Sequence, residues 1–259
     1  SGCATSDQDT TWQLIEEQGI IRVGMDPNWV PFEYVNGAGQ LSGFDVDLAH
    51  ELGRRLQMKV HITNFGFDGL YDALTAGQTD LVISAMVVDM GRSADFAFSA
   101  PYFDAGQVVV VGSNGENIDR LQDLSGHVLA VELGSNADIV ARRWARRLTD
   151  LTLLHTDSAA IALAAVADGK ADAALTDRAT ALIALKANVQ HRKTQTEVSQ
   201  SGPPLEPDLW IVGEPITDEQ YAIIVRKESH NLLSAINTAL GEMRRDGTLE
   251  EMERKWLGP

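Results

Sequence analysis

The chain has 259 residues, of which 44% are hydrophobic and 22% charged, the balance of an ordinary globular protein rather than of a disordered or collagen-like one. It carries 37 acidic and 21 basic residues, a net charge of −16. That charge argues against nucleic acid as a partner, because nucleic-acid binding requires clustered cations. The single cysteine, Cys3, excludes a disulfide framework and a cysteine-based zinc cluster. No apolar run approaches the roughly 20 residues that cross a bilayer.

The first residues are typical of a processed bacterial lipoprotein. Ser1 and Gly2 precede Cys3, as small residues precede the cysteine at which a lipoprotein signal is cut. We therefore expect residues 1–18 to form a tether and Cys3 to be acylated, which would anchor the protein outside the cytoplasm without a span of its own. The alternative is an expression remnant followed by an incidental cysteine.

Short apolar strands alternate with amphipathic helices along the chain. The clearest helix is 45–56, where apolar residues recur at helical spacing, acids occupy the first turn and arginines the last. The alternation predicts an α/β protein with mostly parallel sheets, in two sets that each suffice for a lobe. The predicted strands are 20–24, 59–62, 80–86, 108–111, 127–131, 171–175 and 221–225, and the predicted helices are 45–56, 69–76, 136–148, 158–167, 179–187, 231–245 and 249–256.

Motifs for cofactor or metal chemistry fail on inspection. The glycines at 37, 39 and 43 are spaced one residue too far apart for a dinucleotide fingerprint. His50 and Glu51 begin a zinc-protease motif, but Arg54 stands where its second histidine belongs. We therefore expect no cofactor and no metal.

Several residues fall where a small zwitterion could be held. A site for an amino acid needs a forked donor, an acidic acceptor and apolar walls. Arg92 and Asp177 each follow a predicted buried strand, at the sheet edge where open α/β proteins bind ligands. The backbone of 134–136 opens a predicted helix and could grip an anion. Trp29 and Phe67 could form the walls.

Each of these residues also has an ordinary structural interpretation. An arginine such as Arg92 often forms a surface ion pair, and an aspartate such as Asp177 often caps a helix. Trp29 and Phe67 could belong to the core. The residues taken singly therefore leave both interpretations open.

Taken together, ordered motifs from Gly19 to Gly258 resemble the bacterial extracellular solute-binding proteins of family 3, the amino-acid receptors of ABC importers. The spacing between Arg92 and the segment 98–103 is that of the family. The remaining motifs are Asp26 with 31–34, then 43–49, 67–70, 80–84, 237–240, 246–249 and 255–258.

The resemblance implies a two-lobed, Venus-flytrap architecture of the type II periplasmic-binding-protein class, with an amino acid held between the lobes. Lobe 1 would be discontinuous, comprising 19–103 and 220–259, and lobe 2 would comprise 107–216, with hinges near 102–106 and 216–221. It further implies a monomer in the periplasm or at the cell surface that delivers its ligand to an ABC permease in the membrane.

The resemblance also assigns roles to single residues. Arg92 would fork onto the ligand α-carboxylate and Asp177 would take the α-ammonium. Trp29 and Phe67 would sandwich the ligand side chain, and Asp26 would touch its far end. From lobe 2, Gly134 and Ser135, with Asn136 beside them, would donate to the carboxylate.

Two departures from the family pattern bear on the ligand. Val87 replaces a hydroxyl residue that would contact the carboxylate, so either the backbone around Ala85 and Val87 still contacts the ligand or the ligand is an unusual one. Glu132, with Asp26, places two acids near the side-chain end. We therefore favour a polar or cationic ligand over glutamate or aspartate, because burying another unpaired negative charge is costly.

Two other functions stay open on the same fold. One is a cyclohexadienyl dehydratase acting on prephenate or arogenate, which needs a general acid or base in the cleft, and Glu132 and Asp177 could be mistaken for that pair. The other is a sensing module that presents a bound solute to a signalling partner.

Overall fold

The structure, a computed structural model, describes residues 9–187 and 209–258. Contacts divide the chain into two units. Unit 1 holds the described residues up to Phe103 together with Gln220–Trp256, and unit 2 holds Asp104–Glu219 together with Leu257 and Gly258. Cys3, for which we expect acylation, lies outside the described residues.

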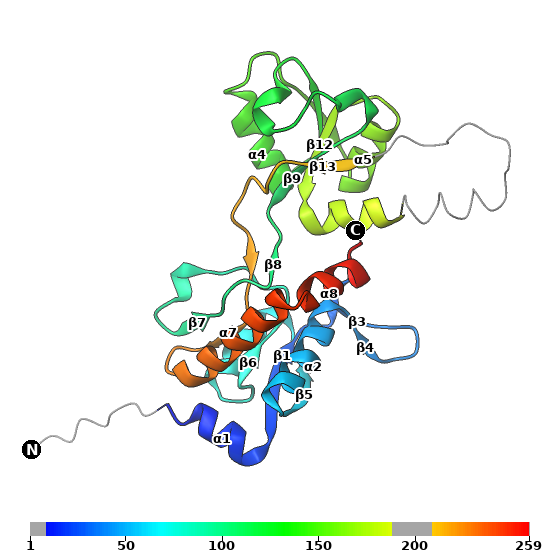
Figure 1. Cartoon of the computed structure of the whole chain (residues 1–259). Helices are drawn as coiled ribbons and strands as arrows, with labels where there is room; N and C mark the ends of the chain where they lie inside the picture. Colours follow the sequence, from blue (N-terminus) through cyan, green and yellow to red (C-terminus); the bar gives the residue numbers. More distant parts are fainter. Residues whose placement is uncertain (1–8, 188–208, 259) are drawn as a thin grey trace, which may run out of the picture. The chain divides into compact units, whose positions relative to one another are not determined.

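Unit 1 is built on a five-stranded sheet with strand order β5-β1-β6-β15-β7 (Figure 1). The first three strands are parallel, whereas β15 runs antiparallel to both β6 and β7. The strands are β1 (Ile20–Met25), β5 (Lys59–Asn64), β6 (Leu81–Val82), β7 (Phe96–Phe98) and β15 (Ile224–Arg226). A separate small sheet contains β2 (Asn28–Trp29), β3 (Glu33–Val35) and β4 (Leu41–Ser42).

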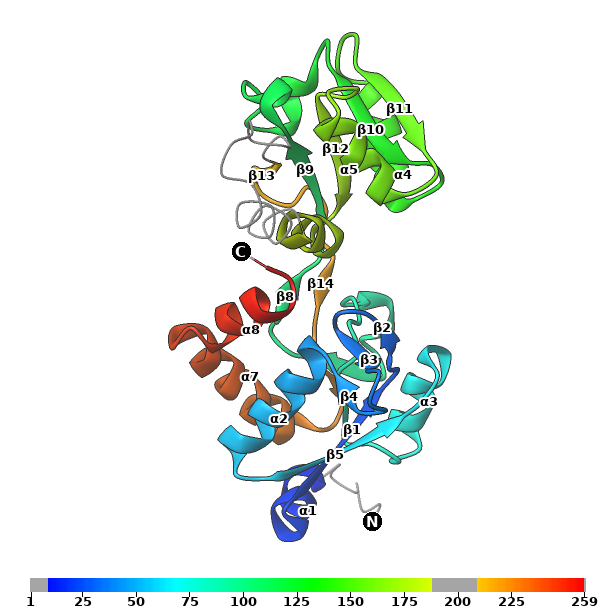
Figure 2. The same ribbon diagram turned by 90° about the vertical axis from the view of Figure 1, so that its right-hand side faces the viewer.

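Helices cover both faces of the unit 1 sheet. Figure 2 shows α3 on the side of the sheet opposite to α2 and α7. The helix α2 turns Leu48, Ala49 and Leu52 into the core, as its apolar spacing predicts. The helices of this unit are α1 (Thr11–Gln18), α2 (Phe44–Leu56), α3 (Leu70–Thr75), α7 (His230–Arg245) and α8 (Thr248–Trp256), with short 3-10 turns η1 (Phe67–Gly69) and η2 (Met90–Arg92).

The expected tether is shorter than 1–18. Residues Thr11–Gln18 form α1, which packs against α7. Ile15 is 2% exposed, and the hydroxyls of Thr11 and Ser229 lie 3.0 Å apart. The helix α1 is therefore part of unit 1, because its packing buries Ile15 there.

Two predicted strands are interrupted. The strand expected over 80–86 is present only as β6, and Ala85, three residues beyond its end, has a φ of +45°, outside the extended region of a strand. The strand expected over 221–225 is split into β14 (Gln220–Tyr221) and β15. β14 pairs with β8 (Phe103–Asp104), so the two segments that connect the units also pair with each other.

Unit 2 is a three-layer α/β unit with strand order β11-β10-β12-β9-β13. Alternate residues of its strands face opposite helices: Leu129 and Val131 pack with α4, and Ala130 packs with α5. A further helix is described over residues 178–187, and it packs on the α5 face through Ala181. The elements are β9 (Gln107–Val111), β10 (Val128–Glu132), β11 (Thr152–Thr156), β12 (Ala173–Asp177), β13 (Trp210–Val212), α4 (Asn136–Ala145), α5 (Ala159–Ala167), η3 (Ser113–Gly115) and η4 (Leu121–Leu124).

The chain end departs from the expected lobe assignment. We expected all of 220–259 in lobe 1, but Leu257 and Gly258 group with unit 2. Leu257 is 0% exposed, and a Cβ at Gly258 would meet the side chain of Lys186 at 2.7 Å. The residues after α8 are therefore buried, and Gly258 lies directly against the helix 178–187.

Among the described helices, none has both the length and the apolarity that crossing a bilayer would require.

Candidate functional site

Three candidate residues of unit 1 meet at one edge of its sheet. β1 and β6 are parallel neighbours, so their carboxyl ends lie at the same edge, where Asp26 follows β1 and Ala85 follows β6. The Asp26 N–H donates to Ser84 Oγ at 3.0 Å, and the Phe67 N–H donates to Asp26 Oδ2 at 3.1 Å. Asp26, Phe67 and the Ser84–Ala85 segment are therefore linked directly.

The two candidate aromatic walls are not core residues of unit 1. Trp29 is 57% exposed and Phe67 is 52% exposed. Trp29 lies in β2, next to Asn28, whose side-chain amide donates to Asp26 Oδ1 at 2.5 Å. Two large, accessible rings therefore accompany the Asp26 carboxylate on the same unit.

The loop after β6 presents an unusual backbone. Ala85 is a non-glycine residue with positive φ, and its N–H donates to Asp45 Oδ2 at 2.6 Å. Val87 is 41% exposed and forms an isolated bridge with Tyr221. The buried carboxylate of Asp45, which sequence reasoning treated only as a helix-start residue, thus holds the loop in place.

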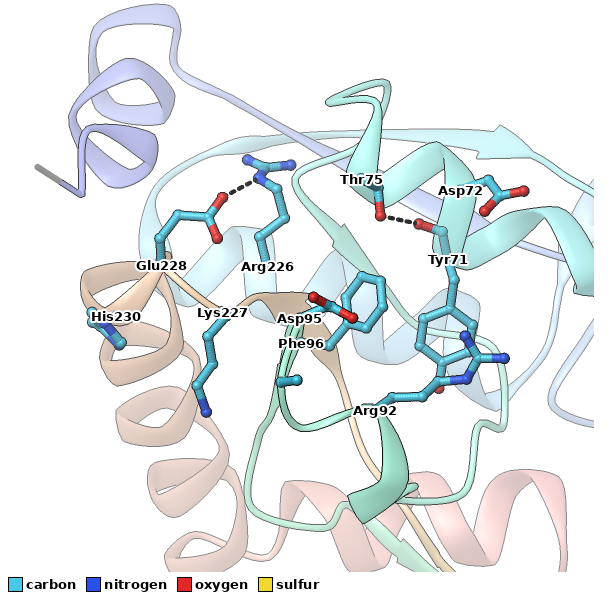
Figure 3. A pocket seen from close by; sticks show the side chains of 11 residues that line it. Tyr71, Asp72, Thr75, Arg92, Asp95, Phe96, Arg226, Lys227, Glu228 and His230 are labelled. Carbon is cyan, nitrogen blue, oxygen red and sulfur yellow. Dashed lines mark hydrogen bonds and ion pairs between the residues drawn. The ribbon is translucent and has the colours of Figure 1, made fainter. Parts of the chain in front are cut away.

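Arg92 faces a surface depression of about 720 Å³ on unit 1 (Figure 3). Its guanidinium lies 4.1 Å from the ring centroid of Tyr71, and Nε lies 3.5 Å from Asp89 Oδ2. The side chain is 51% exposed. The surface ion pair is therefore present, and Tyr71, which no sequence motif had singled out, supplies a cation–π contact. The depression is lined by Tyr71, Asp72, Thr75, Arg92, Ala94, Asp95, Phe96, Arg226, Lys227, Glu228 and His230.

Glu132 and Asp177 share an edge of the unit 2 sheet. They end the parallel neighbours β10 and β12, in which Val131 pairs with Leu175. Asp177 Oδ1 accepts from the Thr180 N–H at 2.8 Å, which is the helix-capping role considered above. Glu132 Oε2 accepts from the N–H of Ala159, the first residue of α5, at 3.0 Å. Each acid thus commits one oxygen to a helix N-terminus.

The loop between β10 and α4 is held by its own acid. Gly134 has a φ of +79°, and its N–H, which we expected to face a ligand carboxylate, donates to Asp138 Oδ2 at 3.0 Å. Ser135 Oγ donates to the Glu132 carbonyl at 2.8 Å and accepts from the Asp138 N–H at 3.2 Å. The Asn136 amide donates to Glu219 Oε1. The donors of this loop are therefore already engaged within unit 2.

Asp138 is the buried carboxylate to which the charged and polar neighbours of that loop bind. It is 3% exposed, and the Arg142 guanidinium donates to it at 2.7 Å while His155 Nε2 lies 3.0 Å from its Oδ1. These contacts, led by the hydrogen bond from Arg142, lower the pKa of Asp138 to about 2. The described His, Cys, Asp and Glu side chains nowhere form a group of three suited to a metal ion.

Comparison with known proteins gives a family match over nearly the whole chain. Residues 21–259 match the family described as bacterial extracellular solute-binding proteins, family 3. A putative amino-acid ABC transporter-binding protein of Vibrio harveyi is 30% identical over 92% of this chain and 88% of its own length.

Two solved structures are similar in sequence and in fold. The L-cystine solute receptor of Neisseria gonorrhoeae, unliganded and open, is 27% identical with a TM-score of 0.80, covering 95% of this chain and 96% of that chain. An ancestral cationic amino acid solute-binding protein is 31% identical with a TM-score of 0.70, covering 95% of this chain and 99% of that one.

Proposed function

The chain belongs to family 3 of the bacterial extracellular solute-binding proteins, and we propose that its ligand is an amino acid with a cationic or polar side chain. The family and the relatives make it the amino-acid-binding receptor of an ABC importer with the type II periplasmic-binding-protein fold. An ancestral cyclohexadienyl dehydratase is also similar in structure, at 25% identity and a TM-score of 0.72, but the matched family is described as solute-binding proteins, and this favours the receptor over the dehydratase alternative.

The observation that carries the ligand class is the pairing of a carboxylate with two accessible aromatic rings on unit 1. Asp26 is linked to Phe67 by a hydrogen bond, and Trp29 and Phe67 are both more than half exposed. Aromatic faces and a carboxylate favour a guanidinium, an ammonium or another polar group. The cationic amino acid receptor and the cystine receptor among the similar structures support the same class.

Further contacts are proposed from both units. Arg92 leaves the Tyr71 ring to take the ligand carboxylate, together with the backbone at Ala85 and Val87. In unit 2, Asp177 takes the ammonium through the oxygen that Thr180 does not use, and Ser135 and Asn136 contribute by exchanging their present partners. Glu132 contributes the oxygen that the Ala159 N–H does not use, whereas Gly134, whose N–H donates to Asp138, shapes its loop.

We propose that the receptor acts as a monomer and that its partner is an ABC permease. Lipid anchoring through Cys3 would keep the receptor at the membrane that holds the permease. Pull-down of a permease supports this assignment, whereas pull-down of a signalling protein favours the sensing module. A mass measurement of the protein from its native membrane tests acylation of Cys3.

Calorimetry tests the ligand class and its residues together. We expect at least one of L-arginine, L-lysine and L-cystine to bind. L-Glutamate should not bind. Asp26→Asn and Arg92→Ala should each weaken binding about 30-fold or more, since each removes a charge-assisted hydrogen bond. Asp119→Asn and Arg254→Ala, at exposed positions, are the matched controls. Unchanged affinity in both site variants contradicts the assignment.

A further inference from the structure

Two carboxyl groups lie buried side by side beneath the candidate binding loop of unit 1. Glu33, in β3, is 1% exposed, and Asp45, in the first turn of α2, is 0% exposed. Their segments are joined by the Asp45 N–H, which donates to the Phe32 carbonyl at 2.8 Å. Gly43 allows this approach, because a Cβ there would overlap the backbone of Phe32.

Three of the hydrogen bonds to this pair come from groups that shape the site. Ser84 Oγ donates to Glu33 Oε1 at 2.7 Å. The Ala85 N–H and the Tyr102 hydroxyl both donate to Asp45 Oδ2, at 2.6 Å and 2.9 Å. The pair therefore holds two successive residues of the loop, including the one with positive φ.

One oxygen of each carboxyl group is left without a donor. Among the described residues, nothing donates to Glu33 Oε2 or Asp45 Oδ1, although both atoms are buried. Each side chain nevertheless acts on the pKa of the other through a hydrogen bond between them. Because Glu33 Oε1 and Asp45 Oδ2 already accept other donors, we infer that this bond joins the two remaining oxygens. A single proton between these oxygens satisfies both atoms, whereas two ionised carboxylates would leave both unsatisfied.

We propose that Glu33 and Asp45 share one proton at neutral pH, and that this pair is a positioning device that holds Ala85 in its ligand-binding conformation. Glu33 carries the proton and donates it to Asp45, which stays anionic and is therefore the stronger acceptor for the Ala85 N–H. The positioning role rests on the proposed function, because it takes the backbone at Ala85 as a ligand contact.

The charged groups around Glu33 and Asp45 favour a pair that carries one proton over a pair that is fully ionised. The ionisable groups that act on the pair are Asp26 beyond β1 and Tyr102 in the connecting segment, and neither is a cation. On the neighbouring helices, Arg244 of α7 donates to the Pro101 carbonyl and Lys255 of α8 pairs with Asp47.

Burial and the negative charge of its partner raise the pKa of Glu33 far above its ordinary value. Burial also raises the pKa of Asp45, but the bonds from Ala85 and Tyr102 oppose that rise. The difference between the two groups places the proton on Glu33.

Infrared spectroscopy of the whole protein tests the proton directly. We expect a carbonyl band of a protonated carboxylic acid at neutral pH, which disappears in Glu33→Gln. The band should persist in Glu250→Gln, which changes an exposed glutamate of α8. Glu33→Gln is expected to fold, since its amide can donate to Asp45 Oδ1 while its oxygen accepts from Ser84. The absence of the band from the wild-type protein overturns the proposal.

The positioning role is tested by binding of L-arginine and by rescue. Glu33→Gln should retain wild-type affinity within about twofold, whereas Glu33→Leu, which lacks a donor, should bind about tenfold more weakly. From about pH 7 to about pH 5 the wild-type affinity should fall as Asp45 takes up a proton, and in Asp45→Asn this pH dependence should be absent. Equal affinities for the Gln and Leu variants, or the same pH profile in Asp45→Asn, overturn the role.

Amide hydrogen exchange distinguishes an error in this positioning proposal from an error in the proposed function. If L-arginine, L-lysine and L-cystine all fail to bind the wild-type protein, the proposed function is wrong and exchange at Ala85 decides this proposal without a ligand. We then expect faster exchange at Ala85 in Glu33→Leu than in Glu33→Gln. Equal exchange rates overturn the proposal.

Discussion

The two units hold their candidate binding loops in the same way but in opposite electrostatic surroundings. In unit 1, Asp45 accepts the N–H of Ala85, whose φ is +45°, and in unit 2, Asp138 accepts the N–H of Gly134, whose φ is +79°. Both acids are buried in the first turn of a helix.

Their neighbours differ in charge. Asp45 faces another acid, Glu33, whereas Asp138 faces Arg142 and His155. Burial raises the pKa of Asp45, although the hydrogen bonds that it accepts oppose that rise, and the arginine lowers the pKa of Asp138 to about 2. One backbone arrangement can therefore be stabilised by a shared proton or by an ion pair, and acid should act on the two loops differently.

The largest expected effect is that of truncating Asp45. Asp45→Ala leaves the Ala85 N–H and the Tyr102 hydroxyl without their acceptor in the core, and we expect unit 1 to lose about 3 kcal/mol of unfolding free energy. Urea denaturation at neutral pH measures the loss, with Glu250→Ala as an exposed control. A loss no greater than that of the control would show that Asp45 does not hold the loop.

Asp138 should show the pH dependence of an ion pair. Its folded pKa is lower than its ordinary value, so its contribution is complete above about pH 4 and is lost as the pH falls through about 2. We expect Asp138→Asn to cost about 2 kcal/mol at neutral pH, and that cost to vanish near pH 2.

For the acidic pair of unit 1, Glu33 and Asp45, the pH dependence of the unfolding free energy has the opposite sign. The raised pKa values of Glu33 and Asp45 mean that protonation of the pair favours the folded state, so its contribution to the unfolding free energy is complete at low pH and declines as the pH rises, even though protonated Asp45 is the weaker acceptor for the Ala85 N–H. Denaturation of Asp138→Asn and of the wild-type protein across the acidic range checks the comparison, with Asp119→Asn as the control. A cost of Asp138→Asn that stays constant with pH would contradict it.

The smallest effects on stability are expected from single substitutions at the two loop residues with positive φ, Gly134 and Ala85. Gly134→Ala should destabilise unit 2 by about 1 kcal/mol through backbone strain alone, since no atom lies within 4 Å of the added Cβ. Ala85→Gly should relieve strain in unit 1 and stabilise it by less than about 1 kcal/mol. Thermal denaturation of both variants measures the difference, and effects of the same sign would show that the loops are not strained alike.

Much of the fold was predictable because it depends on local patterns. The apolar spacing of 45–56 predicted α2 to within one residue, and the acids and arginines at its ends have the expected placement. The motifs around Asp26, Phe67 and Arg92 predicted the family, which the comparisons confirm. Such patterns suffice because a helix or strand buries its apolar side chains with a fixed period.

The features that the sequence patterns did not predict depend on contacts between distant parts of the chain. The loop after β6 is held by the bond from the Ala85 N–H to Asp45, 40 residues away along the chain. Likewise, α1 packs against α7, more than 200 residues later, and Leu257, although it follows α8, groups with unit 2. None of these partners is near in sequence, so no local pattern reveals them.

By itself, the sequence determined the α/β class, because that class follows from periodicity and from the order of strands, and it determined the family through motifs at the family's spacing. Only the tertiary structure decided what each polar group does. It engaged the Gly134 amide with Asp138, directed one oxygen of Glu132 to α5, and placed Glu33 against Asp45. Hydrogen bonding and pKa depend on which groups share a buried space, and folding alone brings those groups together.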